Sequence, residues 1–225
     1  MNTLFESKIK NIIAIDGPSG VGKSTAARRV ASMLNWDYMD TGAMYRAVTL
    51  ALLRAGCAIE DKDGVRRVLD SLNYEQRGAS CFLNGEDVSV ALRAGDITKN
   101  VSIISANSDV REALVSLQRQ LGQNGDWVID GRDIGTVVFP RAACKIFLTA
   151  SQEVRAERRF LELSAKGIRT TLEEVLKDQT MRDIYDSTRE ISPLRKANDA
   201  IELDSSNLSL EEVVDMVVRL AHNYR

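Results

Sequence analysis

Histidine is almost absent from this chain of 225 residues. The single histidine, His222, lies close to the C-terminal end. Histidine is the side chain whose ordinary pKa lies nearest physiological pH, and for that reason it is the commonest catalytic base. We therefore expect any chemistry of this protein to run without a histidine base.

Cysteine is scarce as well. Cys57, Cys81 and Cys144 are odd in number and show no CxxC spacing, which argues against a disulfide framework and a zinc site. No apolar run approaches the roughly 20 residues that span a bilayer, and the N-terminal stretch MNTLFESKIKN lacks the apolar centre of a signal peptide. These features predict reduced thiols, a cytoplasmic location and no association with a membrane.

An excess of charge of either sign is also missing. The net charge is −2 and aromatic residues make up 5% of the chain, so there is no basic, aromatic-rich face for nucleic acid. The apolar fraction of 44% and the charged fraction of 28% are ordinary for a globular protein. Any anion must therefore be bound by a local cluster of positive groups.

Short apolar runs alternate with helical patterns along most of the chain. Such alternation predicts the α/β class, with a parallel central sheet and helices on both faces. The length suffices for one domain with a small insertion. The expected strands are 11–16, 36–40, 127–130, 145–150 and 200–204, and the expected helices are 23–34, 43–54, 63–72, 110–121, 151–165, one after Thr170 and one after Ser209.

Local signals mark several turns and helix ends. Asn84-Gly85 predicts a hairpin within a small β-rich insertion, residues 62–96. Thr41 is a candidate cap for the helix that follows it, and Gly56 fits the end of that helix. Capping boxes are expected at Thr170 with Glu173 and at Ser209 with Glu212. The i, i+4, i+7, i+11 spacing of Val110, Leu114, Leu117 and Leu121 predicts a helix face that packs against the core.

The stretch GPSGVGKS matches the phosphate-binding pattern G-x-x-x-x-G-K-[ST] in full. It follows an expected strand and opens an expected helix, where backbone N–H groups and the helix dipole attract phosphate. Lys23 can reach the β- and γ-phosphates of a nucleotide from a solvated loop, and the Ser24 hydroxyl can ligate Mg²⁺. The expected ATP-binding residues are Gly17, Pro18, Ser19, Gly20, Val21, Gly22, Lys23, Ser24 and Thr25.

Two more polar stretches follow expected strands, at the edge of the sheet where ligands bind in this class. DTGAMYRA follows the second strand and places Tyr45 and Arg46 on the first turn of a helix. DGRDIG places Asp130, Arg132 and Asp133 beside the phosphate loop. Arg132 can hold a second anion, while the aspartates can orient it, bind a substrate hydroxyl or amine, or help to hold hydrated Mg²⁺. The alternative is a structural Asp–Arg–Asp ion network at a turn.

Arginine is abundant in the last third of the chain. Arg182, Asp186 and Arg189 are spaced i, i+4, i+7, which predicts one helix face. Singly, these residues are typical of a solvated helix with local salt bridges. As a set they suit phosphoryl transfer, which needs distributed positive charge and little covalent chemistry.

At this point the sequence resembles the bacterial cytidylate kinases of the nucleoside monophosphate kinase group. The resemblance extends over nearly the whole chain and is carried by IDGPSGVGKST, DTGAMYRA, DGRDIGTVVFP and the pattern RD…D..R…PL at 182–194. It implies a P-loop kinase core at 1–61 and 97–225, a monophosphate-binding insertion at 62–96, and a short lid at 158–170 that closes over ATP.

The resemblance also implies roles for individual residues. The expected CMP contacts are Thr41, Tyr45, Arg46, Arg111, Asp130, Arg132, Asp133, Arg182, Asp186 and Arg189. The expected catalytic residues, which neutralise charge on the transferred group, are Lys23, Arg132, Arg158, Arg182 and Arg189, with Mg²⁺ on Ser24 as cofactor.

The predicted reaction is transfer of the γ-phosphoryl group of ATP to CMP or dCMP by a monomeric enzyme. The alternative in the same class is another small-molecule P-loop kinase, for a different monophosphate or a shikimate-like acceptor. A regulatory GTPase would need an Asn-Lys-x-Asp motif, which the sequence lacks. A nucleic-acid-binding P-loop protein is disfavoured by the charge.

Overall fold

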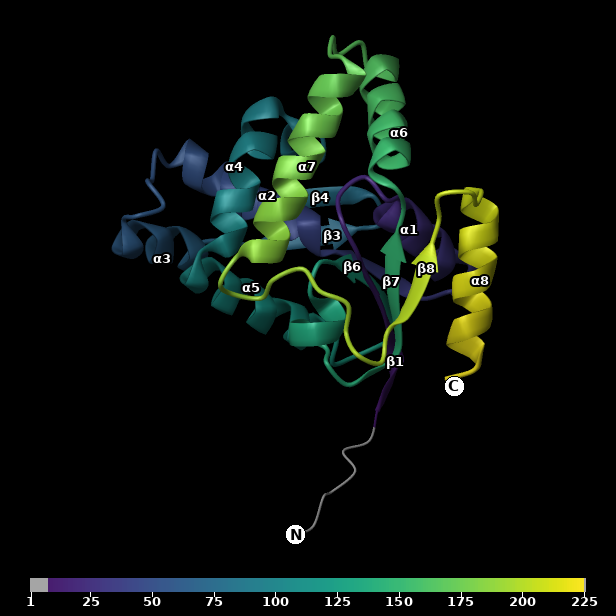
Figure 1. Ribbon diagram of the computed structural model, residues 1–225. Helices are drawn as coiled ribbons and strands as arrows, with labels where there is room; N and C mark the ends of the chain where they lie inside the picture. Colours follow the sequence, from purple (N-terminus) through teal and green to yellow (C-terminus); the bar gives the residue numbers. More distant parts are fainter. Residues whose placement is uncertain (1–7, 225) are drawn as a thin grey trace. The chain divides into compact units, whose positions relative to one another are not determined.

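The computed structural model describes residues 8–224, in which strands and helices alternate along the chain (Figure 1). The strands are β1 (Ile9–Asp16), β2 (Asp37–Asp40), β3 (Tyr74–Arg77), β4 (Ser80–Leu83), β5 (Glu86–Asp87), β6 (Trp127–Gly131), β7 (Ala142–Thr149) and β8 (Ile201–Asp204). The α-helices are α1 (Lys23–Leu34), α2 (Thr41–Arg54), α3 (Lys62–Asp70), α4 (Gly95–Ala106), α5 (Ser108–Leu121), α6 (Gln152–Ala165), α7 (Leu172–Thr188) and α8 (Leu210–His222). Two short turns complete them, the 3₁₀ turn η1 (Ala91–Arg93) and the π-helical turn η2 (Ile134–Val138).

The described chain divides into two compact units. Unit 1 holds the residues up to Tyr38, Gly125–Thr188 and the chain from Ser192 onward, and unit 2 holds Met39–Asn124 and Arg189–Ile191. The antiparallel sheet β3-β4-β5 falls inside the 62–96 segment that the sequence marks as an insertion. The boundaries of that insertion, of the core domain and of the lid stay predictions.

The larger sheet has the strand order β2-β6-β1-β7-β8. β1 pairs in parallel with β6 and with β7, and β7 pairs in parallel with β8. The register sets Asp16 beside Gly131, so the carboxyl ends of β1 and β6 are neighbours. The predicted α/β class with a parallel central sheet is confirmed.

β1 is apolar on both sides because both faces of the sheet are covered. Ile13 and Ile15 pack against α1 and α8 in one cluster of buried residues. Ile12 and Ala14 point to the opposite face and are buried as well. A continuous apolar run is typical of a parallel strand covered on both faces, and the carboxyl end of such a strand is held rigidly.

In unit 2 the small sheet packs against α2. Buried side chains of α2, β4 and α4 form one apolar cluster with Val88 and Leu92. β4 and β5 are joined at Leu83 and Glu86 by the predicted hairpin turn. Asn84 and Gly85 have φ of 51° and 84°, the left-handed geometry that a two-residue hairpin turn requires.

Two of the expected helix caps are wrong by one residue. Asp40, and not Thr41, caps α2, because its carboxylate accepts from the backbone N–H of Ala43 at 2.9 Å. Tyr45 and Arg46 consequently lie beyond the first turn of α2. The box before α7 consists of Thr171 and Glu174, whose side chains each accept a backbone N–H of the other. The predicted box of Ser209 and Glu212 is confirmed.

Three further expectations differ from the structure. Leu121 at the end of α5 is 38% exposed, although Val110 and Leu114 are buried as the spacing predicts. Helix α4 was not expected. Arg189 does not share a helix face with Arg182 and Asp186, because α7 ends at Thr188.

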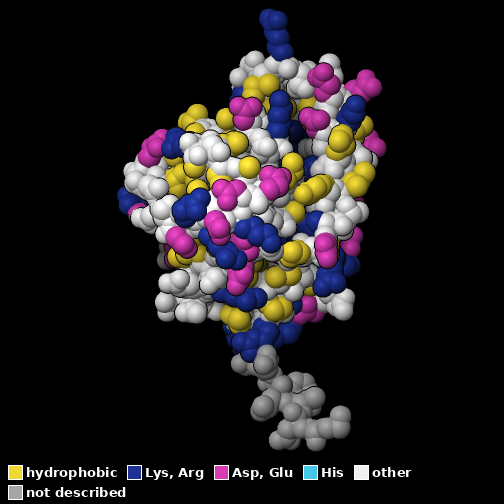
Figure 2. All heavy atoms as spheres, turned by 90° about the vertical axis from the view of Figure 1, so that its left-hand side faces the viewer, with side chains coloured by type: hydrophobic (Ala, Val, Ile, Leu, Met, Phe, Trp, Pro, Cys, Tyr) yellow, Lys and Arg dark blue, Asp and Glu magenta, His cyan; other side chains and the backbone are white. Residues whose placement is uncertain are grey.

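The exposed surface mixes charges of both signs. On the face drawn in Figure 2, Lys and Arg side chains are interspersed with Asp and Glu side chains and with hydrophobic ones. No helix between residues 8 and 224 is long and apolar enough to cross a membrane.

Candidate functional site

The phosphate loop connects β1 to α1 and contains the predicted ATP-binding residues Gly17–Thr25. Gly22 precedes α1 with φ of 92°, and Lys23 is the first residue of the helix. Lys23 is only 5% exposed, so the expectation of a solvated lysine is wrong. Its Nζ donates to the carbonyl of Pro18 at 2.6 Å, which folds the side chain back over the loop. The ammonium is thus held against the backbone of the phosphate loop.

Side chains of α6 and α7 bind the backbone of the phosphate loop. The backbone N–H of Ser19 donates to Asp183 at 3.2 Å, and Arg155 donates to the carbonyl of Ser19 at 3.0 Å. Arg155 also forms a buried ion pair with Asp183. Gly20 lies against the side-chain amide of Gln179, and its φ of 76° is one that residues with a side chain rarely adopt, so glycine is favoured at this point of the loop. The conformation of the loop therefore depends on α6 and α7.

Asp130 at the end of β6 is buried and bonded to two hydroxyl groups. Ser24 donates to one carboxylate oxygen at 2.9 Å, and Tyr38 donates to the other at 2.6 Å. The structure thus joins Asp130 to the phosphate loop, as the common edge of the parallel strands predicts. Since the Ser24 hydroxyl donates its proton here, its lone pairs remain for a cation.

Arg132 is oriented by a residue other than the expected ones. Its Nε donates to Asp186 on α7 at 2.9 Å, and Asp186 is buried. The expectation that Asp130 and Asp133, on either side of it in DGRDIG, orient Arg132 is therefore wrong. A carboxylate of α7, 54 residues further along the chain, fixes the guanidinium.

Positive charge accumulates at Lys23. Burial lowers the pKa of Lys23 well below its usual value, and the charge of Arg132 lowers it further. Arg182 acts in the same direction, whereas Asp130 and Asp16 oppose the shift. The charges of Lys23, Arg132 and Arg182 and those of two carboxylates therefore act on one another in one part of unit 1. A buried cluster of charged groups with a strongly shifted pKa is typical of a binding or catalytic site.

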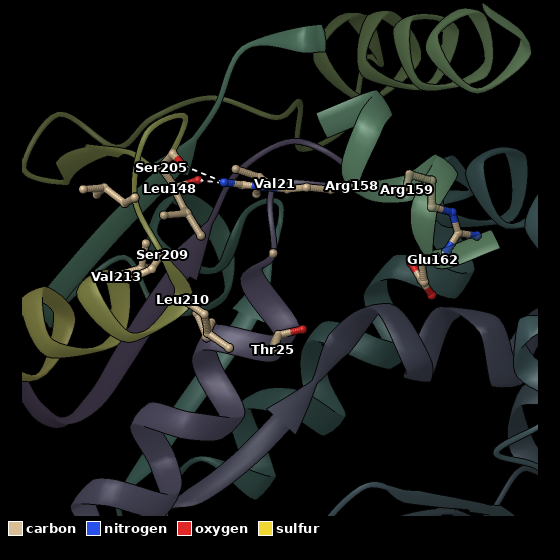
Figure 3. Close-up of a pocket in the computed structure, with 14 residues that line it drawn as sticks. Val21, Thr25, Leu148, Arg158, Arg159, Glu162, Ser205, Ser209, Leu210 and Val213 are labelled. Carbon is tan, nitrogen blue, oxygen red and sulfur yellow. Dashed lines mark hydrogen bonds and ion pairs between the residues drawn. The ribbon is translucent and has the colours of Figure 1, made fainter. Parts of the chain in front are cut away.

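A pocket of about 370 Å³ opens beside the phosphate loop. Figure 3 shows residues of α8, such as Leu210 and Val213, on one side and Arg159 and Glu162 of α6 on another. Arg158 reaches from α6 to Ser205, where it donates to the hydroxyl at 3.1 Å and to the carbonyl at 2.7 Å. Apolar side chains and a few polar ones line the pocket together, which is typical of sites for small molecules.

The other predicted residues belong to unit 2. Arg111 is 3% exposed, donates to the carbonyl of Ser105 and lies with its guanidinium 5.6 Å from the centre of the buried Tyr45 ring. Arg46 donates to the hydroxyl of Thr98 at 3.1 Å. Thr41, at the start of α2, is buried. Within this unit the structure therefore brings Tyr45 and Arg111 together.

Sequence reasoning missed three groups of unit 1 that shape the site. These are Asp16, the ion pair of Arg155 with Asp183, and Tyr38. Asp16 carries a local signal, because it is a charged residue at the end of an apolar strand directly before the phosphate loop. The other two depend on contacts across 28 and 92 residues, for which the sequence shows no pattern.

Comparison with known proteins agrees with this geometry. The sequence profile of the family described as cytidylate kinase matches residues 13–223. A protein of Fusobacterium nucleatum named cytidylate kinase is 47% identical over 206 residues, which cover 92% of this chain and 94% of the relative. A cytidylate kinase of Bacillus cytotoxicus is 49% identical over 212 residues, covering 92% and 94%.

Similarity to solved structures supports the fold alone. An uncharacterized protein from Eubacterium ventriosum has a TM-score of 0.52 at 14% identity, covering 96% of this chain and 99% of that one. The assignment to a family rests instead on the sequence relatives, which are 47% and 49% identical to this chain over 94% of their own length. On that evidence this chain belongs to the cytidylate kinase family.

Proposed function

We propose that this protein transfers the γ-phosphoryl group of ATP to CMP or dCMP, giving ADP and CDP or dCDP. The observation that carries the proposal is the buried Lys23 beside Arg132 and Arg182, at the end of a phosphate loop. Two substrates with phosphate groups would bring negative charge to these cations. The family of the sequence relatives points to a cytidine monophosphate as the acceptor.

The donor would lie along unit 1. Its phosphates would bind Gly17–Thr25 through backbone N–H groups and Lys23. Its base would enter the pocket between α6 and α8. Arg158, which is bonded to Ser205 here, would exchange those bonds for the donor phosphates when the predicted lid at 158–170 closes. Closure would exclude water, which otherwise competes as an acceptor.

The acceptor would be held chiefly through its phosphate. Arg132 has a second edge of its guanidinium to offer, since Asp186 binds only Nε. We propose Asp130, Asp133, Arg182 and Asp186 as further contacts in unit 1, and Thr41, Tyr45, Arg46, Arg111 and Arg189 as contacts in unit 2. The nucleophile is an anionic phosphate oxygen and needs no strong base, so catalysis rests on alignment and charge neutralisation.

The residues at the loop fit magnesium. The Ser24 hydroxyl and the Asp130 carboxylate are hard oxygen donors held 2.9 Å apart. Between residues 8 and 224 no cluster of three or more His, Cys, Asp or Glu side chains could hold a metal ion by itself. Mg²⁺ usually takes its other ligands from substrate phosphates and water, and when bound it neutralises charge on the transferred group.

One assay tests the proposal and its alternative. ADP release is measured with ATP and each of CMP, dCMP, AMP, GMP and shikimate, with and without Mg²⁺. We expect CMP and dCMP to be good acceptors and the others poor ones. Equal use of AMP and CMP, or a preference for shikimate, would replace this proposal by the other kinase class. The monomeric state and the cytoplasmic location stay predictions.

A further inference from the structure

A buried carboxylate without an assigned role lies at the end of β1. Asp16 is 5% exposed. One of its oxygens accepts from the backbone N–H of Ile134 at 2.8 Å, and the other accepts from Gly135 at 2.7 Å. Both N–H groups belong to the start of η2, which directly follows Arg132 and Asp133 in the chain. The carboxylate therefore connects two segments that are 118 residues apart.

The two N–H groups need an acceptor from elsewhere. At the start of any helical turn the first N–H groups have no carbonyl partner within the turn. In η2 the internal bonds run from Val137 and Val138 back to the carbonyl of Asp133. Asp16 is the external acceptor for Ile134 and Gly135, and a buried N–H without one would be costly.

The turn is also confined from its other side. A Cβ added to Gly135 would lie 3.1 Å from the Lys145 side chain and 3.3 Å from an Asp16 oxygen. Lys145 is itself buried and donates to Asp199 at 2.8 Å and to the carbonyl of Pro140. Gly135 thus fills a gap between two fixed side chains, and the start of η2 has little freedom to move.

These contacts bracket Arg132. On one side, Gly131 is paired with Asp16 in the sheet register. On the other side, Asp16 holds Ile134 and Gly135 by hydrogen bonds. One residue therefore fixes the backbone before and after Arg132, while Asp186 fixes its side chain.

We propose that Asp16 is a positioning residue for the acceptor phosphate, which acts by holding the backbone on both sides of Arg132. This inference rests on the proposed role of Arg132. Because Asp16 directly precedes Gly17, it also connects the first residue of the phosphate loop to the segment that carries Arg132. The end of β1 would thereby position both the phosphate loop, which binds the donor, and Arg132, which binds the acceptor.

The ionisation of Asp16 agrees with this role. Burial raises the pKa of Asp16 to about 6, and the two backbone N–H bonds oppose that rise. The neighbouring charge of Asp133 raises the pKa, and that of Lys23 lowers it. At neutral pH the carboxylate is largely ionised, so both of its oxygens can accept.

The test uses Asp16→Asn and Gly135→Ala. Asparagine keeps one acceptor oxygen but presents an NH₂ group to the second N–H, so one bond is lost with little change of volume. Alanine at 135 leaves the carboxylate intact and displaces the turn instead. For both variants we expect kcat/KM for CMP to fall about tenfold or more, the loss that one buried hydrogen bond predicts. The KM for ATP should change by less than about threefold.

Asp61→Asn is the matched control. Asp61 also accepts a backbone N–H, from Gly64 at 2.9 Å at the start of α3, and it is outside the proposed site. The same chemical change there should leave kcat/KM for CMP within about twofold of wild type. Amide exchange at Ile134 and Gly135 supplies a readout that is independent of activity, and it should become faster in Asp16→Asn but not in Asp61→Asn.

The outcomes separate positioning from mere stability. If the variants lose folded protein but keep wild-type kcat and KM per active site, the inference is wrong. A defect confined to the KM for ATP overturns it as well, since it would place Asp16 on the donor side alone. The assay of the wild type with CMP tests the proposed function alone. The inference about Asp16 is tested by the ratio of kcat/KM between variant and wild type, measured with the best acceptor, and by amide exchange.

Discussion

Replacing Arg132 by lysine separates the shape of this side chain from its charge. In the structure Nε donates to Asp186 at 2.9 Å, and one terminal nitrogen makes a long contact of 3.4 Å with the carbonyl of Gly131. The outer edge of the guanidinium can therefore bind a phosphate with two parallel N–H groups. A lysine ammonium is a single point on a flexible stem and cannot bind Asp186 and a phosphate in this way at once.

The size of the defect follows from the bonds lost. One hydrogen bond to a charged group contributes about 1.5–3 kcal/mol, and about 1.4 kcal/mol corresponds to tenfold in rate. We expect kcat/KM for CMP to fall about 10- to 150-fold in Arg132→Lys. Because the positive charge beside Asp186 is kept, the free energy of unfolding should change little, and the KM for ATP should change by less than about threefold.

Steady-state kinetics provide the measurement. ADP formation is followed with CMP varied at saturating ATP, and then with ATP varied at saturating CMP. Arg54→Lys is the control, because Arg54 forms a two-bond pair with Glu86 at 2.6 and 2.8 Å outside the proposed site. If Arg132→Lys keeps more than half of the wild-type kcat/KM for CMP, the proposed two-bond contact between Arg132 and the acceptor phosphate is refuted. A defect seen only in the KM for ATP would move Arg132 to the donor side.

Four further predictions follow from the site. Lys23→Ala should lower kcat by about 10²–10³, and retention of more than about a tenth of the wild-type turnover would contradict the role of the loop lysine. The predicted lid at 158–170 should show slower amide exchange with ATP and CMP bound than without them; equal exchange argues against a lid. AMP and GMP should be much poorer acceptors than CMP, because polar groups that match cytosine would be left unbonded. The folded-state pKa of Asp16, about 6, lies above its ordinary value of 3.8, so its contribution to stability is gained as pH falls from about 6 to 4 and lost as pH rises again. Relative to Asp16→Asn, the wild type should gain about 2 to 2.5 kcal/mol of unfolding free energy between pH 7 and pH 4; a constant difference in chemical denaturation over that range would show that the carboxyl titrates normally.

Local patterns were sufficient for most of the elements. Helix α1 has the predicted bounds, Lys23–Leu34, because a phosphate-loop pattern marks its start. Helix α4 was missed although its buried residues Ile97, Val101 and Ile104 have the i, i+4, i+7 spacing of a helix face. Its β-branched residues and poor start signal obscure that pattern, and packing against α2 compensates for the weak propensity.

The partners of the site residues could not be predicted. The sequence places Arg132 between two aspartates, and local reasoning assigned its orientation to them. The bond goes instead to Asp186, because α7 brings a buried carboxylate to the end of β6. Sequence spacing indicates which residues share a strand end or a helix face. It does not indicate which of several nearby carboxylates a given arginine selects, since that choice depends on tertiary distances of a few ångströms.

The near absence of histidine agrees with the arrangement of the phosphate loop. An acceptor that is already an anion needs its charge compensated more than it needs a proton removed. Burial lowers the pKa of Lys23, and the charges of Arg132 and Arg182 lower it further. Like charges repel one another more strongly in a buried setting than in water. Phosphates bound beside these cations would offset that repulsion. The cations that repel one another at the loop are thus the ones that would stabilise the transferred group. Their positive charge is local, since the net charge of the whole chain is −2.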